Sequence, residues 1–409
     1  MEPKKILSKA KEAMDEDLCD HCLGRLFAQL GHGLTNDERG CTLRIAYAML
    51  DGERKRTPVP EETKDCSLCD NLFEELITLS EYILEEVENF EFDTFLVGSR
   101  VDPEIEEREE RLWAKLDIVN SEPIKSEVNR EIGKLVDAEL EAEVDLKKPD
   151  IKCIVDTRFH SIDIELSPLF IYGRYCKLSR QIPQTKWECK KCRGVGCDHC
   201  DGKGKMYETS VEEIIGEPLL ELTGGSDFTL HGMGREDIDA LMLGSGRPFV
   251  IEVKEPIRRN VDFSGLVETI EDDDRVEISD LKSVGRDEVK KIKSAKSDKS
   301  YVVKVRFSES VDRGKLKKVF LSLRGAEISQ RTPKRVSHRR ADKIRKRIIK
   351  QLWIEECHDD NASIGLKCES GTYVKEFIHG DEGRTVPNLS DSIGVKCEVQ
   401  GLNVIEVHY

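Results

Sequence analysis

The sequence predicts an α+β protein with more than one domain, and three observations lead to this fold class. The chain has 409 residues, 38% of them hydrophobic, which is long for one hydrophobic core and suits two or three domains. Helical and strand-like periodicities both occur, but they do not alternate regularly, which favours a mixed sheet over a doubly wound parallel one. Two clusters of cysteines, spaced like metal ligands, mark the N-terminal region and the middle of the chain.

The composition argues against a membrane protein. No apolar run approaches the roughly 18 residues that a transmembrane helix needs, and residues 1–17 lack the apolar stretch of a secretory signal, so we expect a cytoplasmic protein. The net charge of −16 is unusual for a nucleic-acid-binding protein, but residues 1–150 carry −18 and the remainder carries +2. Residues 331–350, the basic segment, hold ten Lys/Arg and one Asp. An acidic chain can therefore still present a basic face.

The first 70 residues contain two Cys-x2-Cys pairs, Cys19/Cys22 and Cys66/Cys69. Two such pairs can supply four thiolates to a tetrahedral zinc ion. A closed four-thiolate site leaves no position for water, so it stabilises the fold and does not catalyse. The alternative is a set of reduced, unliganded thiols. We expect a zinc-binding module over residues 1–70.

The next region has the pattern of a helix followed by strands. From Leu72 to Phe90, apolar residues recur every three or four positions, which predicts an amphipathic helix. Residues 93–98 (DTFLVG) predict a strand, and a charged helical region follows. The segments KCIVD (152–156) and HSIDIELSPLFIYG (160–173) again predict strands.

The second cysteine cluster separates the two halves of the chain. It has the spacing Cys189-x2-Cys192-x4-Cys197-x2-Cys200 and is interspersed with glycines that allow tight turns. Zinc is again the best interpretation. Because four residues between the pairs is a short connection, a site without metal is the alternative.

Beyond this cluster, strands and helices mix irregularly. The strand candidates are FVIEV (249–253), YVVKVRF (301–307), ASIGLKCE (362–369), GVKCEVQ (394–400) and LNVIEVHY (402–409). The helical candidates are Glu288–Lys293 and Lys334–Leu352.

The most informative stretch runs from Leu230 to Pro256. Two glycines precede the charged group Arg235-Glu236-Asp237-Ile238-Asp239, and a second glycine turn, Gly244-Ser245-Gly246, leads into the strand FVIEV. Small residues around one carboxylate suggest a loop that another backbone or a ligand can approach closely. From composition alone, a solvated surface turn explains the pattern equally well.

The residues Gly234-Arg235-Glu236-Asp237 resemble the Gly-Arg-x-Asp loop of pseudouridine synthases. The longer string GREDIDALMLGSGRPFVIEV resembles the archaeal and eukaryotic tRNA pseudouridine synthase family that acts on uridines 54 and 55 of the T arm. Residues 170–189, 300–306, 328–347 and 370–390 extend the resemblance over most of the chain. It implies tRNA as partner, a THUMP-type RNA-binding domain over 71–185, and a catalytic domain over 186–409. The second cysteine cluster lies at the start of this catalytic domain, whose sheet should be mixed and mainly antiparallel.

The resemblance also implies a role for individual residues. Asp237 becomes the nucleophile that attacks the uracil ring or the ribose anomeric carbon, and the isomerisation consumes no cofactor. Tyr301 would stack on the flipped base or move a proton, and Lys375 would keep Asp237 ionised. Arg235 would displace the target base or clamp a phosphate. The remaining substrate-binding candidates, which we place in the pocket wall, are Tyr373, Val374 and Leu402.

Each of these roles has a simpler alternative. The two tyrosines fit half-buried strand aromatics, and Lys375 fits a solvated strand charge. Asp239 is the rival nucleophile, two residues from Asp237, but the Gly-Arg-x-Asp register favours Asp237.

The basic segment fits a loop and helix that hold RNA phosphates without reading bases, because it contains no Phe, Tyr or Trp. A solvated basic helix face is the alternative. The candidate phosphate ligands are Arg331, Lys334, Arg335, Arg339, Arg340, Arg345 and Arg347.

Two other functions compete with pseudouridine synthesis. Residues 223–228 (TGGSDF) resemble the pyrophosphate-binding loop of THUMP-containing tRNA sulfur transferases, but the match is partial and no clear helix follows it. A zinc-containing, non-enzymatic tRNA-binding adaptor would explain the cysteines and the basic segment, but not the Asp237 loop. We expect structural zinc, no organic cofactor and a monomer.

Overall fold

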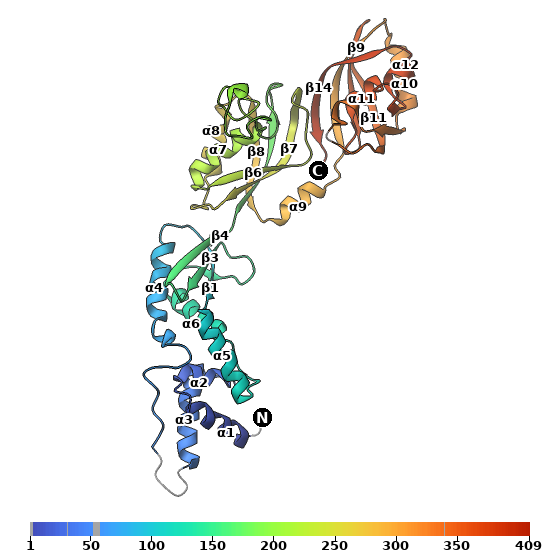
Figure 1. The fold of residues 1–409 in the computed structure, drawn as a ribbon. Helices are drawn as coiled ribbons and strands as arrows, with labels where there is room; N and C mark the ends of the chain where they lie inside the picture. Colours follow the sequence, from blue (N-terminus) through green and yellow to red (C-terminus); the bar gives the residue numbers. More distant parts are fainter. Residues whose placement is uncertain (1–2, 31, 52–57, 339) are drawn as a thin grey trace. The chain divides into compact units, whose positions relative to one another are not determined.

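The computed structural model describes residues 3–30, 32–51, 58–338 and 340–409. It divides into two compact units, Met1–Ser167 and Pro168–Tyr409, which we describe separately (Figure 1). Within the described ranges, no helix is both long and apolar enough to cross a membrane.

The first unit begins with α1 (Pro3–Met14), α2 (Asp20–Arg25) and α3 (Asn36–Asp51). The predicted amphipathic helix is confirmed as α4 (Leu76–Val87), and a short 3-10 turn η1 (Leu72–Glu74) precedes it. Leu76, Leu79 and Ile83 of α4 are buried, because apolar residues three or four positions apart share one face of a helix.

A four-stranded sheet completes the first unit, in the order β2-β1-β3-β4. Strand β1 runs parallel to β2 and β3, and β3 pairs antiparallel with β4. One hydrophobic core extends from the N-terminal helices to this sheet, so the zinc-module region and the predicted THUMP region share buried residues. The remaining elements are β1 (Thr94–Arg100), α5 (Pro103–Leu116), α6 (Ile124–Glu139), β2 (Glu143–Val144), β3 (Ile151–Asp156) and β4 (Ser161–Leu166).

The second unit is built on a ten-stranded sheet with the order β13-β10-β11-β12-β9-β14-β7-β5-β8, in which β6 also pairs with β7. Among the pairings described within this second sheet, β7 with β14 is the one parallel pair, so the sheet is mixed and mainly antiparallel, as predicted. Its strands are β5 (Leu169–Lys177), β6 (Asp227–Gly232), β7 (Ala240–Lys254), β8 (Val276–Val284), β9 (Lys299–Phe307), β10 (Glu327–Arg331), β11 (Ile344–Cys357), β12 (Asn361–Cys368), β13 (Thr385–Val386) and β14 (Cys397–Val407).

Helices cover the two halves of this sheet separately, and each half has its own core (Figure 1). Helices α7 and α8 pack on β6, β7 and β8, whereas α10 packs on β11 and α11 packs on β14. We call the junction of β7 with β14 the seam. The helices are α7 (Val211–Thr223), α8 (Phe263–Glu271), α9 (Asp287–Ser294), α10 (Arg313–Leu323), α11 (Val374–His379) and α12 (Leu389–Ile393), with 3-10 turns η2 (Asp198–Cys200) and η3 (Lys334–Val336).

The predicted helix over Lys334–Leu352 is wrong. Only the turn η3 is helical, and residues from Ile344 onward form β11, which pairs with β10 on one side and β12 on the other. Arg345 and Arg347 alternate with more exposed neighbours and lead to buried Ile349, which is the period-two pattern of a strand. The density of basic residues concealed this alternation.

The prediction that a glycine turn at residues 244–246 precedes a strand is also wrong. Both glycines lie inside the long strand β7. Gly244 has a φ of 67°, and a Cβ there would lie 1.9 Å from the carbonyl oxygen of Ile405. These glycines therefore allow β7 to bend closely against β14.

The predicted strand over residues 160–173 is split between the two units, as β4 and β5. The division between the units falls between Ser167 and Pro168, whereas the predicted THUMP-type domain extends to residue 185. The predicted strand over 394–400 begins only at Cys397, because Gly394 ends α12.

Candidate active site

We call the loop between β6 and β7, residues 233–239, the catalytic loop, after the role that the sequence predicts for Asp237. It lies beside the seam and lines a cavity of about 700 Å³ in the second unit. The other walls come from β9, β14, the N-terminus of α11 and the basic segment. The predicted residues that line the cavity are Arg235, Asp237, Tyr301, Arg335, Arg340, Tyr373, Val374, Lys375 and Leu402.

A buried ion pair supports the catalytic loop. The Glu236 carboxylate lies 2.8 Å from Nε of Arg247, and both side chains are 1% exposed. The Tyr175 hydroxyl donates to both Glu236 oxygens at 2.9 and 3.0 Å. Arg247 also donates through Nη1 to the Met233 carbonyl at 2.7 Å. Because a buried charge is tolerated only when it is paired, this group fixes the loop to β5 and β7.

Three further side chains bind carbonyl groups of the catalytic loop. Lys177 Nζ donates to the Ile238 carbonyl at 2.7 Å, and Gln184 Nε2 donates to the Gly234 carbonyl at 3.0 Å. Arg180 Nη1 donates to the Asp239 carbonyl at 2.5 Å. We did not predict these three residues individually. Their one signal was a run of polar residues at the end of the buried strand β5 and just beyond it, within a string that carries the family resemblance.

Asp237 lies between two cations. Its carboxylate is 3.1 Å from Nη1 of Arg335 and 3.3 Å from Nζ of Lys375. Partial burial raises the pKa of Asp237, but the charges of Arg335 and Lys375 outweigh burial, and the net pKa is lowered. The carboxylate is therefore ionised at neutral pH while 32% of the side chain remains exposed. An ionised, accessible oxygen is what a carboxylate nucleophile requires.

Lys375, the predicted partner of Asp237, forms ion pairs with both carboxylates of the loop, Asp237 and Asp239. Its Nζ lies 2.8 Å from each oxygen of Asp239, closer than to Asp237. The Asp239 side chain is 66% exposed, twice as exposed as that of Asp237. Asp239 thus contacts Lys375 from the solvent side, and Asp237 has the deeper position.

The contacts of Arg335 differ from those of the phosphate ligand that the sequence predicts. We expected a phosphate ligand, but its Nε binds the buried Glu376 carboxylate at 2.7 Å while its Nη1 reaches Asp237. Glu376 lies on α11. The side-chain amide of Gln330 holds the start of this helix through two 2.9 Å hydrogen bonds with the backbone of Tyr373. Both cations that contact Asp237 therefore come from the half of the sheet that α10 and α11 cover.

Tyr301 lies on β9 opposite Val404 of β14 and lines the cavity. Burial raises the pKa of its hydroxyl above the ordinary value, so the phenol is neutral at physiological pH. Val374 and Leu402 are buried and supply apolar wall. Tyr373 is half-buried, and its hydroxyl lies 3.2 Å from Nη1 of Arg340.

Most other cations of the basic segment form exposed contacts. Arg331 binds Asp342 at 2.8 Å, and Lys334 pairs with Glu382. Arg345 donates to the Thr332 hydroxyl at 3.0 Å, and Arg347 donates to the Lys346 carbonyl at 2.6 Å. Arg339 lies outside the described residues.

Both cysteine clusters have the geometry of a four-thiolate site. Within each cluster the four sulfurs lie within 4.8 Å of one another. Cys19 and Cys69 are 3.8 Å apart, and three pairs of the second cluster lie at 3.7 to 3.9 Å. A tetrahedron with Zn–S bonds of about 2.3 Å has S–S edges of about 3.8 Å, whereas a disulfide is much shorter. Either cluster could hold a metal ion.

The loop that resembled a sulfur-transferase motif does not have the geometry for binding pyrophosphate. Thr223 is the last residue of α7, and Gly224 caps the C-terminus of that helix. A helix C-terminus presents carbonyl groups and negative potential, which repel phosphate. Asp227 begins β6 and pairs with Lys254 at 2.7 Å.

Comparison with known proteins identifies the family. The model of the Pus10 C-terminal region matches residues 170–408, and that of the archaeal Pus10 THUMP domain matches residues 79–156. The tRNA pseudouridine synthase Pus10 of Halorubrum lacusprofundi is 43% identical over 400 residues, covering 95% of this chain and 93% of that protein. The tRNA pseudouridine synthase Pus10 of Pyrococcus furiosus is 36% identical over 403 residues, covering 98% of each chain.

Among solved structures, a Cbf5-Nop10-Gar1 complex matches with a TM-score of 0.33 at 14% identity, covering 57% of this chain and 48% of that one. A likeness this low supports no conclusion. The two family models and the full-length relatives cover both units and include the catalytic loop. The chain therefore belongs to the Pus10 family of tRNA pseudouridine synthases.

Proposed function

We propose that this chain converts uridine to pseudouridine at positions 54 and 55 of the tRNA T arm, with Asp237 as the nucleophile. The observation that carries the proposal is the environment of Asp237. Its ionised carboxylate lies in a cavity of about 700 Å³, on a loop that the buried Glu236–Arg247 pair holds in place. A cavity of this size accepts a flipped nucleotide.

The reaction is an isomerisation, so it needs no redox partner and no organic cofactor. The bond from uracil N1 to ribose C1′ breaks, a bond from C5 to C1′ forms, the proton on C5 leaves, and N1 gains a proton. An oxygen of Asp237 attacks either uracil C6 or ribose C1′, and both routes require the unprotonated carboxylate. Arg335 and Lys375 keep it in that form.

Tyr301 has the position and protonation state of a residue that contacts the base. Its ring stacks on the uracil, and its neutral hydroxyl can relay the C5 proton. Val374, Tyr373 and Leu402 close the pocket around the rotating ring. The side chains of Val374 and Leu402 are apolar, so they contact a detached uracil without hydrogen bonds that would fix one orientation.

We further propose that the exposed cations of the basic segment bind tRNA phosphates. Most of their present partners are exposed carboxylates and carbonyls, which a phosphate can replace at little cost, whereas Arg345 donates to the buried Thr332 hydroxyl. Arg331, Lys334, Arg340, Arg345 and Arg347 fit this role; Arg335 does not, because Glu376 and Asp237 hold it.

Zinc is the metal that we propose for both cysteine clusters, because four thiolates at tetrahedral spacing favour it. Backbone N–H groups point at the sulfurs, for example Gly204 N to Cys200 Sγ at 3.2 Å, and stabilise thiolate charge. Four protein ligands leave no open position, so the ion would be structural. A cytoplasmic location and a monomeric state stay predictions.

The decisive experiment replaces Asp237 with Asn and incubates the protein with unmodified tRNA transcript. Pseudouridine, mapped by mass spectrometry after chemical labelling, should be undetectable, while tRNA binding persists. Asp239→Asn is the matched control and should retain activity within about tenfold, because it changes a partner of Lys375 and not the nucleophile. Pseudouridine formation by Asp237→Asn contradicts the assignment, and an inactive wild type contradicts the function.

Position specificity needs separate transcripts. Replacing uridine 54 or uridine 55 with cytidine should each leave one pseudouridine, and the double replacement should leave none. A residual product in the double replacement contradicts the proposed positions.

A further inference from the structure

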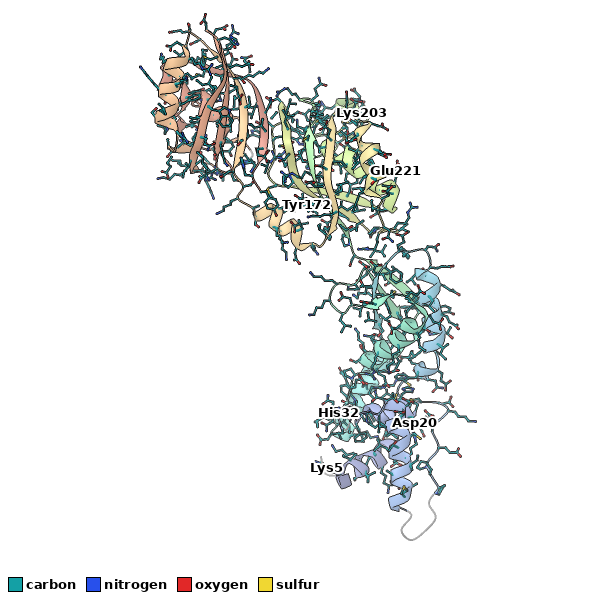
Figure 2. All side chains as sticks on the ribbon, turned by 180° about the vertical axis from the view of Figure 1, so that it is seen from behind. Lys5, Asp20, His32, Tyr172, Lys203 and Glu221 are labelled. Carbon is teal, nitrogen blue, oxygen red and sulfur yellow. The ribbon has the colours of Figure 1, made fainter. Side chains whose placement is uncertain are left out.

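The second cysteine cluster belongs to a small hairpin, residues 188–205, which we call the cysteine hairpin. Its two ends meet through a bridge between Glu188 and Lys205 and a 2.8 Å hydrogen bond from Cys189 N to the Gly204 carbonyl. Lys203, labelled in Figure 2, is exposed on this hairpin. The hairpin thus closes at its base, where the chain enters and leaves it.

Two aromatic residues lie at that base. Met206 N donates to the Trp187 carbonyl at 2.8 Å, which sets the two flanking segments side by side. The ring centroids of Trp187 and Tyr207 are 5.5 Å apart with an interplanar angle of 82°, an edge-to-face contact. Both rings are half-buried, and both line the cavity that contains Asp237.

This aromatic pair also contacts the catalytic loop. The guanidinium carbon of Arg235 lies 5.3 Å from the centroid of the Trp187 ring, a cation–π distance. Arg235 is two residues before Asp237. A chain of contacts therefore leads from the cysteine hairpin through Trp187 and Arg235 to the loop that carries the nucleophile.

We propose that Trp187 and Tyr207 form a stacking subsite for a second nucleobase of the RNA, beside the target uridine, and that the metal-bound cysteine hairpin holds this pair in place. The inference rests on the proposed function. In this arrangement the target uracil stacks on Tyr301 beside the carboxylate of Asp237, and an unpaired neighbouring base stacks at Trp187, which lines the same cavity and contacts Arg235. Recognition is by ring stacking and is tolerant of base identity.

Beyond the backbone hydrogen bonds at its base, the cysteine hairpin has little apolar packing. Val195 at its tip is 88% exposed, and of its residues only Cys189, Cys200 and Gly204 are buried. Glycines 194, 196, 202 and 204 all have positive φ values, so the backbone follows a course that apolar packing does not maintain. An ion on four sulfurs would cross-link the segments above this base and so stiffen the support of Trp187 and Tyr207.

The test measures single-turnover pseudouridine formation at increasing concentrations of unmodified tRNA transcript, which separates apparent affinity from maximal rate. Trp187→Leu should weaken apparent affinity by about 5-fold to 100-fold, the range that corresponds to losing one stacked base. Trp187→Phe keeps a flat ring and should stay within about threefold of wild type. The matched control is Trp353→Leu on β11, whose side chain does not line the cavity.

A readout that loss of structure would not mimic is the dependence of affinity on salt. Stacking releases no counterions, so Trp187→Leu should leave the slope of log Kd against log salt unchanged. An unchanged Kd for Trp187→Leu overturns the subsite. A lower slope also overturns it, because the tryptophan would then act through phosphate contacts.

The role of the metal is tested by a double-mutant cycle. Cys192→Ser should lose one zinc per chain by native mass spectrometry and weaken affinity to the same extent as Trp187→Leu. The two changes together should weaken it no further, because both remove the same stacking contact. Additive losses contradict a positioning role for the hairpin.

Fluorescence separates this inference from the proposed function. In a Trp113→Phe, Trp353→Phe protein, Trp187 is the one remaining tryptophan, and binding of tRNA transcript should quench its emission. Quenching by tRNA with no pseudouridine from wild type overturns the function and retains the subsite. Pseudouridine formation without quenching overturns the subsite and retains the function.

Discussion

The catalytic loop and the basic segment both bring charged side chains to one cavity, but they are held in different ways. The catalytic loop is supported by fully buried groups: Glu236 with Arg247 beneath it, and Lys177 on its carbonyls. Apart from Arg335 and Arg345, the cations of the basic segment have exposed partners, such as Asp342 for Arg331 and Glu382 for Lys334. A nucleophile must be positioned within a fraction of an ångström, whereas a phosphate-binding cation works over a range of positions. The two supports match the roles that we propose for Asp237 and for the exposed cations.

The largest effect should come from breaking the buried support. Glu236→Gln leaves Arg247 as an uncompensated buried cation and should lower the free energy of unfolding by about 3–5 kcal/mol. Urea denaturation followed by circular dichroism measures it. Glu236→Gln as stable as wild type would show that the loop does not depend on this pair.

The second effect concerns the pH dependence of the reaction. Because Arg335 lowers the pKa of Asp237, replacing it with Gln should raise that pKa and move the acid limb of the single-turnover rate to higher pH. Wild type keeps the ionised form as pH falls to the lowered pKa and loses activity below it. The maximal rate should also fall by about a hundredfold through misplacement of the carboxylate.

Arg345→Gln is the control for this profile, because Arg345 contacts Thr332 and not Asp237. Its acid limb should coincide with that of wild type. Coincident limbs for Arg335→Gln and wild type would contradict the electrostatic role of Arg335.

A smaller effect is expected for the basic segment itself. Arg345→Gln with Arg347→Gln should weaken tRNA binding several-fold and reduce the salt slope by about one per lost phosphate contact, with the maximal rate unchanged. Filter binding at several salt concentrations measures both quantities. A fall in maximal rate instead would place these residues in the chemistry.

The smallest effect should be that of Lys334→Gln on stability. It removes an exposed ion pair with Glu382, and surface pairs contribute little. The midpoint of thermal unfolding should not change measurably. A clear decrease would show that the basic segment is also held rigidly, which would remove the contrast with the catalytic loop.

The features that the sequence could predict are those with local signals. The period of α4, the alternation in β9 and β12, and the spacing of the cysteines each lie within a short window, and the structure confirms them. The position of Asp237 came from a four-residue register that the family resemblance supplied. Local spacing was sufficient in these cases because each feature is formed by neighbours in the chain.

Features that depend on distant parts of the chain could not be predicted. Arg335 is 98 residues from Asp237, and nothing in the basic segment distinguishes it from Arg345 or Arg331. Its role follows from Glu376, which becomes its partner only when α11 is packed. Similarly, the contacts of Lys177 and Gln184 with the catalytic loop have no local signal, because their partners lie far away in the sequence, at Ile238 and Gly234.

The seam between β7 and β14 has a mechanical consequence for the enzyme. Three residue pairs join these strands, and the pair Ala240–Leu402 lies at the edge of the cavity. Asp237 is carried by one half of the sheet, whereas Arg335 and Lys375 are carried by the other. A small torsion of the sheet about this line would lengthen both charge contacts at once. The ionisation of the proposed nucleophile therefore depends on how closely the two halves are held together at this line.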